Sequence, residues 1–261
     1  MNRIEFFLTN IRKSISLEID YKNFKDFIFE FDGKTKLEDI IIKNKIIKES
    51  NTYTELLNLI NYLNQQNILL KIDETYIKDY YNFPRIFSLL EDFSLSISEI
   101  NEKFINIKNS KVMIIGLGSV GTWVANSLVM SGVENLILID GDKVEITNLH
   151  RQLGYFEENL NKYKVDVAKE NLYCKNKNIN IDTINNYIDS NFFEKYIFEN
   201  ISLIINCADY PSVDTTSNII GEYALKNNIP HIIGGGYNLH LTLIGQVIIP
   251  HETACVNCFR K

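Results

Sequence analysis

The chain has 261 residues, of which 45% are hydrophobic and 23% charged, so it can bury the core of one large domain or of two ordinary ones. Its formal net charge is −6, and a division near residue 105 leaves two mildly acidic parts, which argues against a nucleic-acid-binding protein. No segment is apolar over the length of a membrane helix and the N-terminus has no signal-peptide pattern, so we expect a cytoplasmic protein outside the membrane.

Residues 1–79 predict a small winged-helix-like α+β domain. Partial alternation of apolar and polar residues predicts three strands, at 3–9, 14–20 and 26–33. Helical spacing of apolar residues predicts helices at 37–50 and 52–73, the second running into a short strand. A DNA-binding role is disfavoured, because 54–66 contains no Lys or Arg to meet phosphates. The alternative is an N-terminal extension that supports a dimer or the sheet.

Residues 80–110 predict a helical linker, and the nucleotide signals begin after it. Val112–Ile115 reads as a buried strand, followed by Gly116, Gly118 and Gly121, an amphipathic helix and a second strand that ends at Asp140. Three glycines at this spacing permit a tight turn and close approach of the backbone to a phosphate. The helix N-terminus behind them attracts anions. The stretch therefore predicts a nucleotide site, with Asp140 on the ribose.

The next segments indicate which nucleotide is bound. Polar and charged residues cluster soon after Asp140, namely Asp142, Asn148, Arg151 and Gln152, and Lys164 follows. Cations near a helix N-terminus suit a triphosphate, whose charge must be neutralised before its α-phosphorus is attacked. The apolar run 202–207 predicts a central parallel strand, and Asp209 just beyond it would share a crevice with Asp140. Asp209 could hold Mg²⁺, and it could also cap a helix that begins near Pro211.

Five separated motifs carry a family resemblance: GLGSVG, LIDGD, TNLHRQ, Lys164 and CADYP, in this order. From Lys111 to its end the chain resembles the ThiF/MoeB family of ATP-dependent adenylating enzymes, relatives of the ubiquitin-activating enzymes. Within the family, CADYP is most similar to the microcin-type peptide adenylating enzymes of the MccB group. The resemblance implies an α/β fold, with a Rossmann-like doubly wound sheet as the adenylation domain, 111–261.

The resemblance also implies roles for residues and partners. It implies that Arg151, Lys164 and Asp209 are catalytic, with Asn148, Arg151 and Lys164 around the ATP phosphates and Asp209 on Mg²⁺. It implies a homodimer in which Arg85 reaches the ATP of the neighbouring subunit, although Ile86 follows it where the family usually has Gln or Asn. It implies, finally, that the N-terminal domain is a clamp that binds a precursor peptide by strand addition.

The C-terminal segment suggests an incomplete metal site. Cys255 and Cys258 form a C-x-x-C, which in the family binds zinc together with a second such pair. A tetrahedral zinc site needs four ligands, and the chain supplies two here before it stops at Lys261. We therefore expect an adenylation domain that lacks its C-terminal part, which a further chain could supply. Gly234–Gly236 could admit an extended substrate chain close to the backbone.

The sequence thus predicts an ATP-dependent adenylyltransferase that acts on the C-terminal carboxylate of a ribosomally made peptide. One alternative is activation of a small sulfur-carrier protein, which fits the nucleotide core but leaves the N-terminal domain unexplained. The other is a non-catalytic subunit that binds the precursor peptide and delivers it to a separate enzyme. The end of the sequence at Lys261 favours this subunit, whereas catalysis is favoured by the retained residues Asp140, Asn148, Arg151, Lys164 and Asp209.

Overall fold

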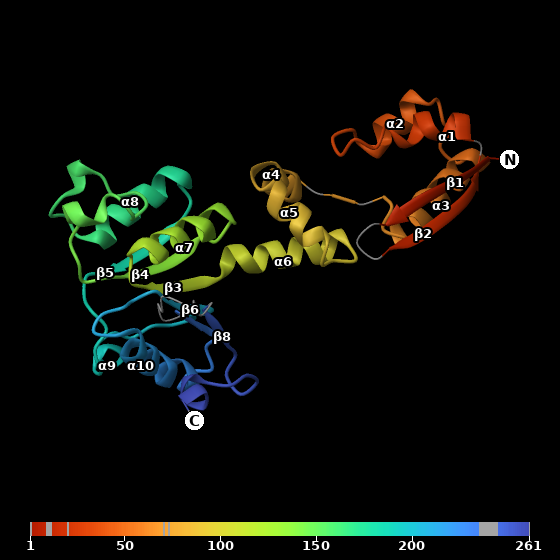
Figure 1. The fold of residues 1–261 in the computed structure, drawn as a ribbon. Coiled ribbons are helices and arrows are strands. Elements are labelled where there is room, and N and C mark those ends of the chain that lie inside the picture. The colour runs from red at the N-terminus through yellow and green to blue at the C-terminus, as the bar shows by residue number, and fades with distance from the viewer. Residues whose placement is uncertain are drawn as a thin grey trace. The chain divides into compact units, whose positions relative to one another are not determined.

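The computed structural model describes residues 2–8, 12–19, 21–69, 71–72, 74–234 and 245–260. The chain forms two compact units, Met1–Ile105 and Asn106–Lys261, whose boundary falls within one helix, α6 (Ile97–Asn109). Each unit, drawn as a ribbon in Figure 1, has its own helices and strands, and side chains form separate hydrophobic clusters in the two units. In the described part of the chain, no helix is long and apolar enough to cross a membrane.

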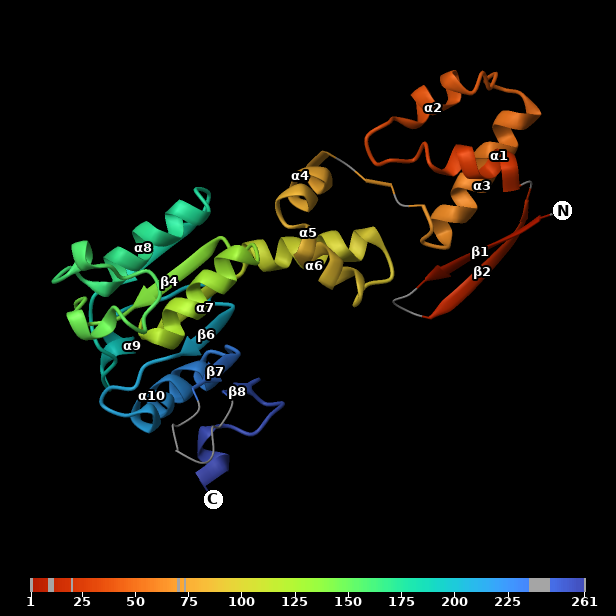
Figure 2. The same cartoon turned by 45° about the horizontal axis from the view of Figure 1, so that its top comes forward.

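The first unit starts with an antiparallel pair of strands, in which Phe6 of β1 (Asn2–Leu8) lies opposite Ile15 of β2 (Lys13–Ile19). The helices that the described residues form before α6 are α1 (Tyr21–Ile28), α2 (Leu37–Lys43), α3 (Asn51–Gln65), α4 (Glu74–Asn82) and α5 (Pro84–Glu91) (Figure 2). Phe87 and Phe104 are fully buried where α5 packs on α6.

Two expectations for this unit are wrong. The segment 26–33 is not a strand, because it continues α1 and then turns. Phe24, Phe27 and Phe31 recur at three- and four-residue spacing, and the rings of Phe27 and Phe31 lie 5.0 Å apart. The helix expected at 37–50 ends at Lys43, because Lys45 adopts a left-handed φ of 54° and the N–H of Ile46 bonds to the carbonyl of Ile41. The described residues after α3 include no returning strand, so the winged-helix description stays a prediction.

The second unit is built on a six-stranded sheet with the order β5-β4-β3-β6-β7-β8. Its first five strands are parallel, and β8 is antiparallel to β7. The strands are β3 (Lys111–Ile115), β4 (Asn135–Ile139), β5 (Asn180–Ile184), β6 (Leu203–Asn206), β7 (His231–Ile233) and β8 (Gln246–Ile248). The chain reverses its direction of winding between β3 and β6, which is the switch point where ligands bind in such sheets.

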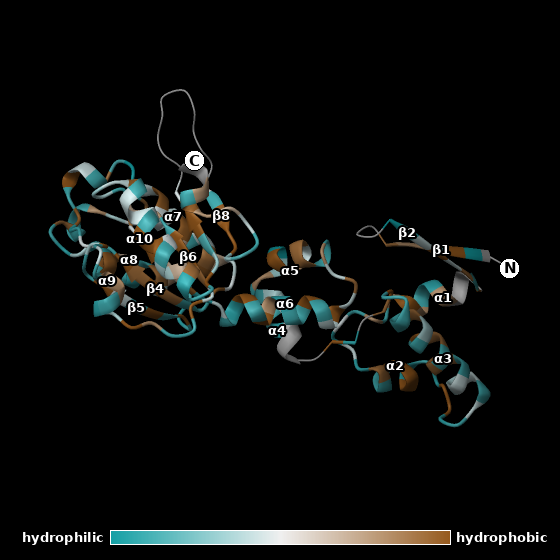
Figure 3. Ribbon diagram, turned by 90° about the horizontal axis from the view of Figure 1, so that it is seen from below, coloured by the Kyte–Doolittle hydropathy of each residue, from teal (hydrophilic) through white to brown (hydrophobic). Residues whose placement is uncertain are grey.

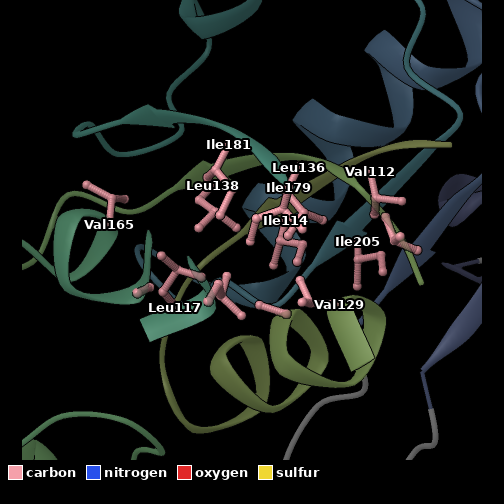
Figure 4. Close-up of a cluster of buried hydrophobic side chains, with 14 residues drawn as sticks. Val112, Ile114, Leu117, Val129, Leu136, Leu138, Val165, Ile179, Ile181 and Ile205 are labelled. Atoms are coloured by element: carbon pink, nitrogen blue, oxygen red, sulfur yellow. The ribbon is translucent and has the colours of Figure 1, made fainter. Parts of the chain in front are cut away.

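Helices cover both faces of this sheet, as the doubly wound fold requires (Figure 1). Side chains alternate along each strand, so Ile114 and Leu138 pack toward α7 (Ser119–Met130) and α8 (Lys164–Lys175), as Figure 4 shows for their cluster. On the other face, Met113 packs toward α9 (Phe192–Lys195) and α10 (Val213–Lys226). Because both faces are buried, the central strands β4 and β6 are hydrophobic along most of their length (Figure 3).

Candidate functional site

The turn after β3 depends on glycine at two positions. Gly116 has a φ of 90°, and a Cβ atom there would lie 2.7 Å from the backbone of Ala208. A Cβ atom on Gly121 would lie 1.8 Å from the carbonyl oxygen of Gly116. At Gly118, by contrast, the nearest atom to an added Cβ is the Gln152 Nε2, 3.9 Å away. The first and last glycines are therefore needed for packing, and the middle one leaves the backbone open at the N-terminus of α7.

Asp140 ties this turn to the loop that follows β4. The side chain is 9% exposed, and its Oδ2 accepts the N–H of Leu117 at 2.6 Å while its Oδ1 accepts the N–H of Asp142 at 2.7 Å. Burial raises the pKa of Asp140, against the lowering effect of these bonds and of the Lys164 charge. The buried hydroxyl of Tyr155 donates to the Leu117 carbonyl at 3.0 Å and holds the turn from the other side. Each Asp140 oxygen keeps a lone pair for a ligand hydroxyl.

Lys164 reaches the site because its segment pairs with the loop after Asp140. Lys143 and Tyr163 form an antiparallel bridge, and the N–H of Lys164 donates to the Asp142 carbonyl at 3.0 Å. The Lys164 side chain is buried, and its Nζ donates to Asp142 Oδ2 at 2.8 Å. Against the desolvation of partial burial, hydrogen bonds from Lys164 and Tyr187 lower the pKa of Asp142.

The remaining residues of this loop lie in or just after a short 3₁₀ turn, η1 (Ile146–Asn148). Asn148 is buried, and its side-chain oxygen accepts the N–H of Glu145 at 2.9 Å. Arg151 is exposed, and its guanidinium donates to the carbonyl of Thr147. Gln152 is 7% exposed, and its Oε1 finds no hydrogen-bond partner among the residues that the structure describes. A buried acceptor without a donor is costly, so a ligand group that donates to it would be stabilised.

Asp209 lies beyond the end of β6 and does not cap the next helix. The cap of α10 is Ser212, whose hydroxyl accepts the N–H of Thr215 at 3.1 Å. Buried Asn206 fixes the loop, since its Nδ2 donates to two hydroxyls of α10 and its Oδ1 accepts the N–H of Ala208. Asp209 is exposed, so its carboxylate is open to a ligand. The alternative role as a helix cap is therefore wrong.

An open cavity of about 1190 Å³ lies at the switch point. The sequence-predicted residues that line it are Gly116, Gly118, Asp140, Asp142, Asn148, Arg151, Gln152, Lys164 and Asp209. Gly121 is not one of the lining residues, and it contributes by packing against Gly116 in the turn. Arg85 is in the other unit, at an exposed position in the first turn of α5. Gly234 lines the cavity, whereas Gly235 and Gly236 lie outside the described residues.

The sequence reasoning missed aromatic residues in this cavity. Tyr187 follows β5, and its hydroxyl donates to Asp142 Oδ1 at 2.5 Å, which raises the pKa of Tyr187 to about 12. Tyr210 and Trp123, the one tryptophan of the sequence, also line the cavity. The signal for Tyr187 was its position after a strand, because the carboxyl ends of parallel strands meet at the same edge of the sheet.

Three of the four cysteines are relevant to catalysis or metal binding. Cys207 lies at the end of β6, where burial raises the pKa of its thiol to about 11 and disfavours a nucleophilic thiolate. The Sγ atoms of Cys255 and Cys258 lie 3.4 Å apart, and this hydrogen bond lowers the pKa of Cys255. Two thiolates on one zinc ion would be about 3.8 Å apart, so the pair fits half of a tetrahedral site. No group of three or more His, Cys, Asp or Glu that could hold a metal occurs among the described residues.

The comparison with protein families identifies the family to which the second unit belongs. The profile of the ThiF family matches residues 94–261, more than half of the chain. The chain belongs to the ThiF family. This confirms the resemblance stated from the motifs.

Two curated relatives illustrate the family. The molybdopterin-synthase adenylyltransferase of Haemophilus influenzae is 38% identical over 143 residues, which are 55% of this chain and 56% of that protein. The sulfur carrier protein ThiS adenylyltransferase of Bacillus subtilis is 31% identical over 158 residues, which are 58% of this chain and 44% of that protein. The chain thus spans about half the length of these relatives.

Escherichia coli MccB, crystallised with AMPCPP and MccA, superposes with a TM-score of 0.61 at 24% identity, covering 92% of this chain and 69% of that one. At this identity the likeness concerns the fold. It agrees with the Rossmann-like doubly wound sheet that the motifs of this ThiF-family chain predict.

Proposed function

We propose that this ThiF-family chain is an ATP-dependent adenylyltransferase that activates the C-terminal carboxylate of a ribosomally made peptide, as in microcin-type antibiotic biosynthesis. The proposal rests on the cavity at the switch point, which is lined by the glycine turn, by Asp140 and by the buried Lys164. The names of both curated relatives support adenylyl transfer. The CADYP motif and the fold likeness to MccB support a peptide as the substrate.

The proposed reaction joins the peptide carboxylate to the α-phosphorus of ATP. A carboxylate oxygen attacks the phosphorus, the bond from that phosphorus to the bridging oxygen breaks, and pyrophosphate leaves with the electron pair. No general base is needed, because a C-terminal carboxyl is already ionised at neutral pH. The protein then contributes by positioning the reactants and by neutralising the charge that develops on the phosphates.

Each cavity residue has a role that its geometry permits. The open backbone at Gly118 and the N-terminus of α7 face the phosphates, where unpaired N–H groups favour an anion. Asp140 accepts the ribose hydroxyls with its remaining lone pairs. Asn148, Arg151 and Lys164 surround the triphosphate, as the family resemblance implies. Lys164 keeps N–H groups for a phosphate, because an ammonium has three and one is used by Asp142.

Asp209 is the candidate ligand for the magnesium ion that accompanies ATP. Mg²⁺ usually keeps several waters and takes one or two carboxylates together with substrate phosphates, so a single exposed carboxylate in the cavity fits it. Bound Mg²⁺ supplies charge neutralisation on the phosphates. Zn²⁺ is proposed at Cys255 and Cys258, which offer half of a structural site, with the other ligands from a further segment or chain.

The first unit is proposed to hold the peptide. Its two-stranded sheet, β1 and β2, can accept a third strand through main-chain hydrogen bonds. The proposal includes a homodimer in which Arg85, exposed in α5, reaches the triphosphate of the partner subunit. The helix α3 begins at Asn51 and its sequence contains no Lys or Arg, which agrees with a peptide rather than DNA as the ligand.

A second candidate function is activation of a small sulfur-carrier protein, and the name of the Bacillus subtilis relative favours it. ATP–pyrophosphate exchange by the 261-residue chain tests both candidates. We expect exchange that depends on a peptide ending in Asn. Exchange that depends on a peptide ending in Gly-Gly would favour the sulfur-carrier function. Binding of peptides without any exchange would mean that the chain is a non-catalytic subunit, and the proposal would be abandoned.

A further inference from the structure

Tyr187 and Lys164 share one carboxylate in the candidate site. The Tyr187 hydroxyl donates to Asp142 Oδ1 at 2.5 Å, and the Lys164 ammonium donates to Asp142 Oδ2 at 2.8 Å. Lys164 begins α8, whereas Tyr187 follows the edge strand β5. The two donors therefore come from different elements and meet on Asp142, which follows β4.

The position of the Tyr187 ring is built into the fold. Its ring atoms occupy the space beside Gly141, where an added Cβ would lie 2.7 Å from two of them. The ring of Tyr210 contacts it from another side, with the centroids 5.2 Å apart. Although Tyr187 is 43% exposed, it is thus held between a backbone that only glycine leaves open and a second ring. Its hydroxyl has a defined direction toward Asp142.

Asp142 needs such a restraint because its side chain is 46% exposed, whereas that of Lys164 is 6% exposed. A half-exposed carboxylate can rotate and can bind an ammonium with either oxygen or with both. A hydrogen bond to Oδ1 fixes the plane of the carboxylate and leaves Oδ2 for the lysine. The high pKa of Tyr187 keeps its hydroxyl protonated, so it remains a donor throughout the neutral range.

We propose that Tyr187 is a positioning residue that acts through Asp142 to hold the Lys164 ammonium where the ATP triphosphate binds. This inference rests on the proposed function. A preorganised ammonium loses less freedom when the phosphate arrives, so the restraint increases the affinity for ATP. Without the Tyr187 hydroxyl, Asp142 turns freely, Lys164 samples several positions, and the triphosphate must order both.

The test compares two conservative variants by ATP titration. Trp123, the one tryptophan of the sequence, lines the cavity, so its fluorescence reports binding without catalysis. Tyr187→Phe removes only the hydroxyl that bonds Asp142. Tyr163→Phe is the matched control, because Tyr163 precedes Lys164 outside the cavity and its hydroxyl bonds to no group that the structure describes. We expect ATP affinity to fall about five- to tenfold in Tyr187→Phe and less than about twofold in the control.

Two further readouts separate positioning from a structural effect. In the Asp142→Asn background, the Tyr187→Phe change should have no additional effect on ATP affinity, because the carboxylate through which Tyr187 acts on Lys164 is already absent. In pyrophosphate exchange, Tyr187→Phe should raise the KM for ATP by the same factor as its affinity loss, with kcat changed less than about twofold. The thermal midpoint of Tyr187→Phe should stay within about 2 °C of the unmodified chain.

The outcomes distinguish this inference from the function on which it rests. If the unmodified chain binds ATP and the two variants have equal affinities, Tyr187 does not position Lys164 and the proposed function stands. If Tyr187→Phe weakens binding equally with and without Asp142→Asn, the tyrosine acts by another route and the inference is wrong. If the unmodified chain does not bind ATP, both are wrong.

Discussion

The α-helix of the nucleotide turn is packed so closely on the strand before it that a Cβ atom on Gly121 would lie 1.8 Å from the carbonyl oxygen of Gly116. Neither atom belongs to a flexible side chain, so the contact cannot relax by a change of rotamer. The same turn brings the N–H of Leu117 onto Asp140 and the backbone of Gly116 against Ala208, after β6. Gly121 thereby controls the geometry of the whole switch point.

Gly121→Ala should destabilise the second unit by about 3 kcal/mol or more, since α7 must move away from the turn. Gly118→Ala is the matched control, because its Cβ meets only the Gln152 Nε2 at 3.9 Å. We expect Gly118→Ala to keep the stability of the unmodified chain and to lose affinity for ATP, because the methyl group lies on the open backbone. Denaturant unfolding and Trp123 fluorescence measure the two effects. Equal stability of the two variants would contradict the packing argument.

Lys164→Met should weaken ATP binding without unfolding the chain. The substitution removes a charge-assisted hydrogen bond to a phosphate, which corresponds to roughly 10- to 100-fold in affinity. It keeps the length of the buried side chain and leaves Asp142 half-exposed to water, so stability should change little. Lys162→Met controls for a lost lysine nearby, because Lys162 is exposed and outside the cavity. Equal ATP affinities of the two variants would remove Lys164 from the site.

Most of the second unit could be predicted from the sequence because its signals are local. The strand predicted at Val112–Ile115 is observed as Lys111–Ile115, and the one predicted to end at Asp140 ends at Ile139. Apolar runs bounded by glycines encode buried parallel strands directly. The secondary structure of the first unit was harder to predict, because the aromatic residues in 24–31 fit both the two-residue period of a strand and the period of a helix. Contact of Phe24 with Phe6 of β1 favours the helix, and no local pattern records it.

The sequence predicted which polar residues line the candidate site, but not the hydrogen bonds that join them. The motifs named the polar residues that line the cavity, because each follows a strand or a glycine turn. They did not indicate that the two Asp140 oxygens already accept backbone N–H groups, one from 23 residues away in the chain. They also missed Tyr187, which joins the site only because β5 pairs with β4 and places its loop beside Asp142. Such contacts depend on strand order.

Arg151→Ala should reduce ATP–pyrophosphate exchange about 100-fold or more while the fold stays intact. Its side chain is exposed, lines the cavity and donates a hydrogen bond to the carbonyl of Thr147. Loss of that contact leaves an exposed carbonyl to water, so the thermal midpoint should not change by more than about 2 °C. Exchange at the unmodified rate in Arg151→Ala would discard the role in catalysis.

The buried His231, which does not line the nucleotide cavity, should make the stability of the chain depend on pH. It is fully buried at the start of β7, with Nδ1 3.3 Å from the Ile229 carbonyl and no partner for Nε2 among the described residues. Burial lowers the pKa of His231 below its ordinary value of about 6.5. The unfolded chain therefore binds a proton at this residue in a pH range where the folded chain does not. Protonation of the unfolded state lowers the free energy of unfolding as pH falls below about 6.5.

His231→Leu removes both the proton linkage and a buried nitrogen without a partner. We expect the variant to gain stability relative to the unmodified chain as pH is lowered from about 7.5 to 5.5, by up to about 1.4 kcal/mol for each pH unit below 6.5. His150→Leu is the control, because His150 is exposed. Urea unfolding at several pH values measures the difference. A gap between His231→Leu and the unmodified chain that stays constant with pH would mean that His231 takes up its proton equally in the folded and unfolded states.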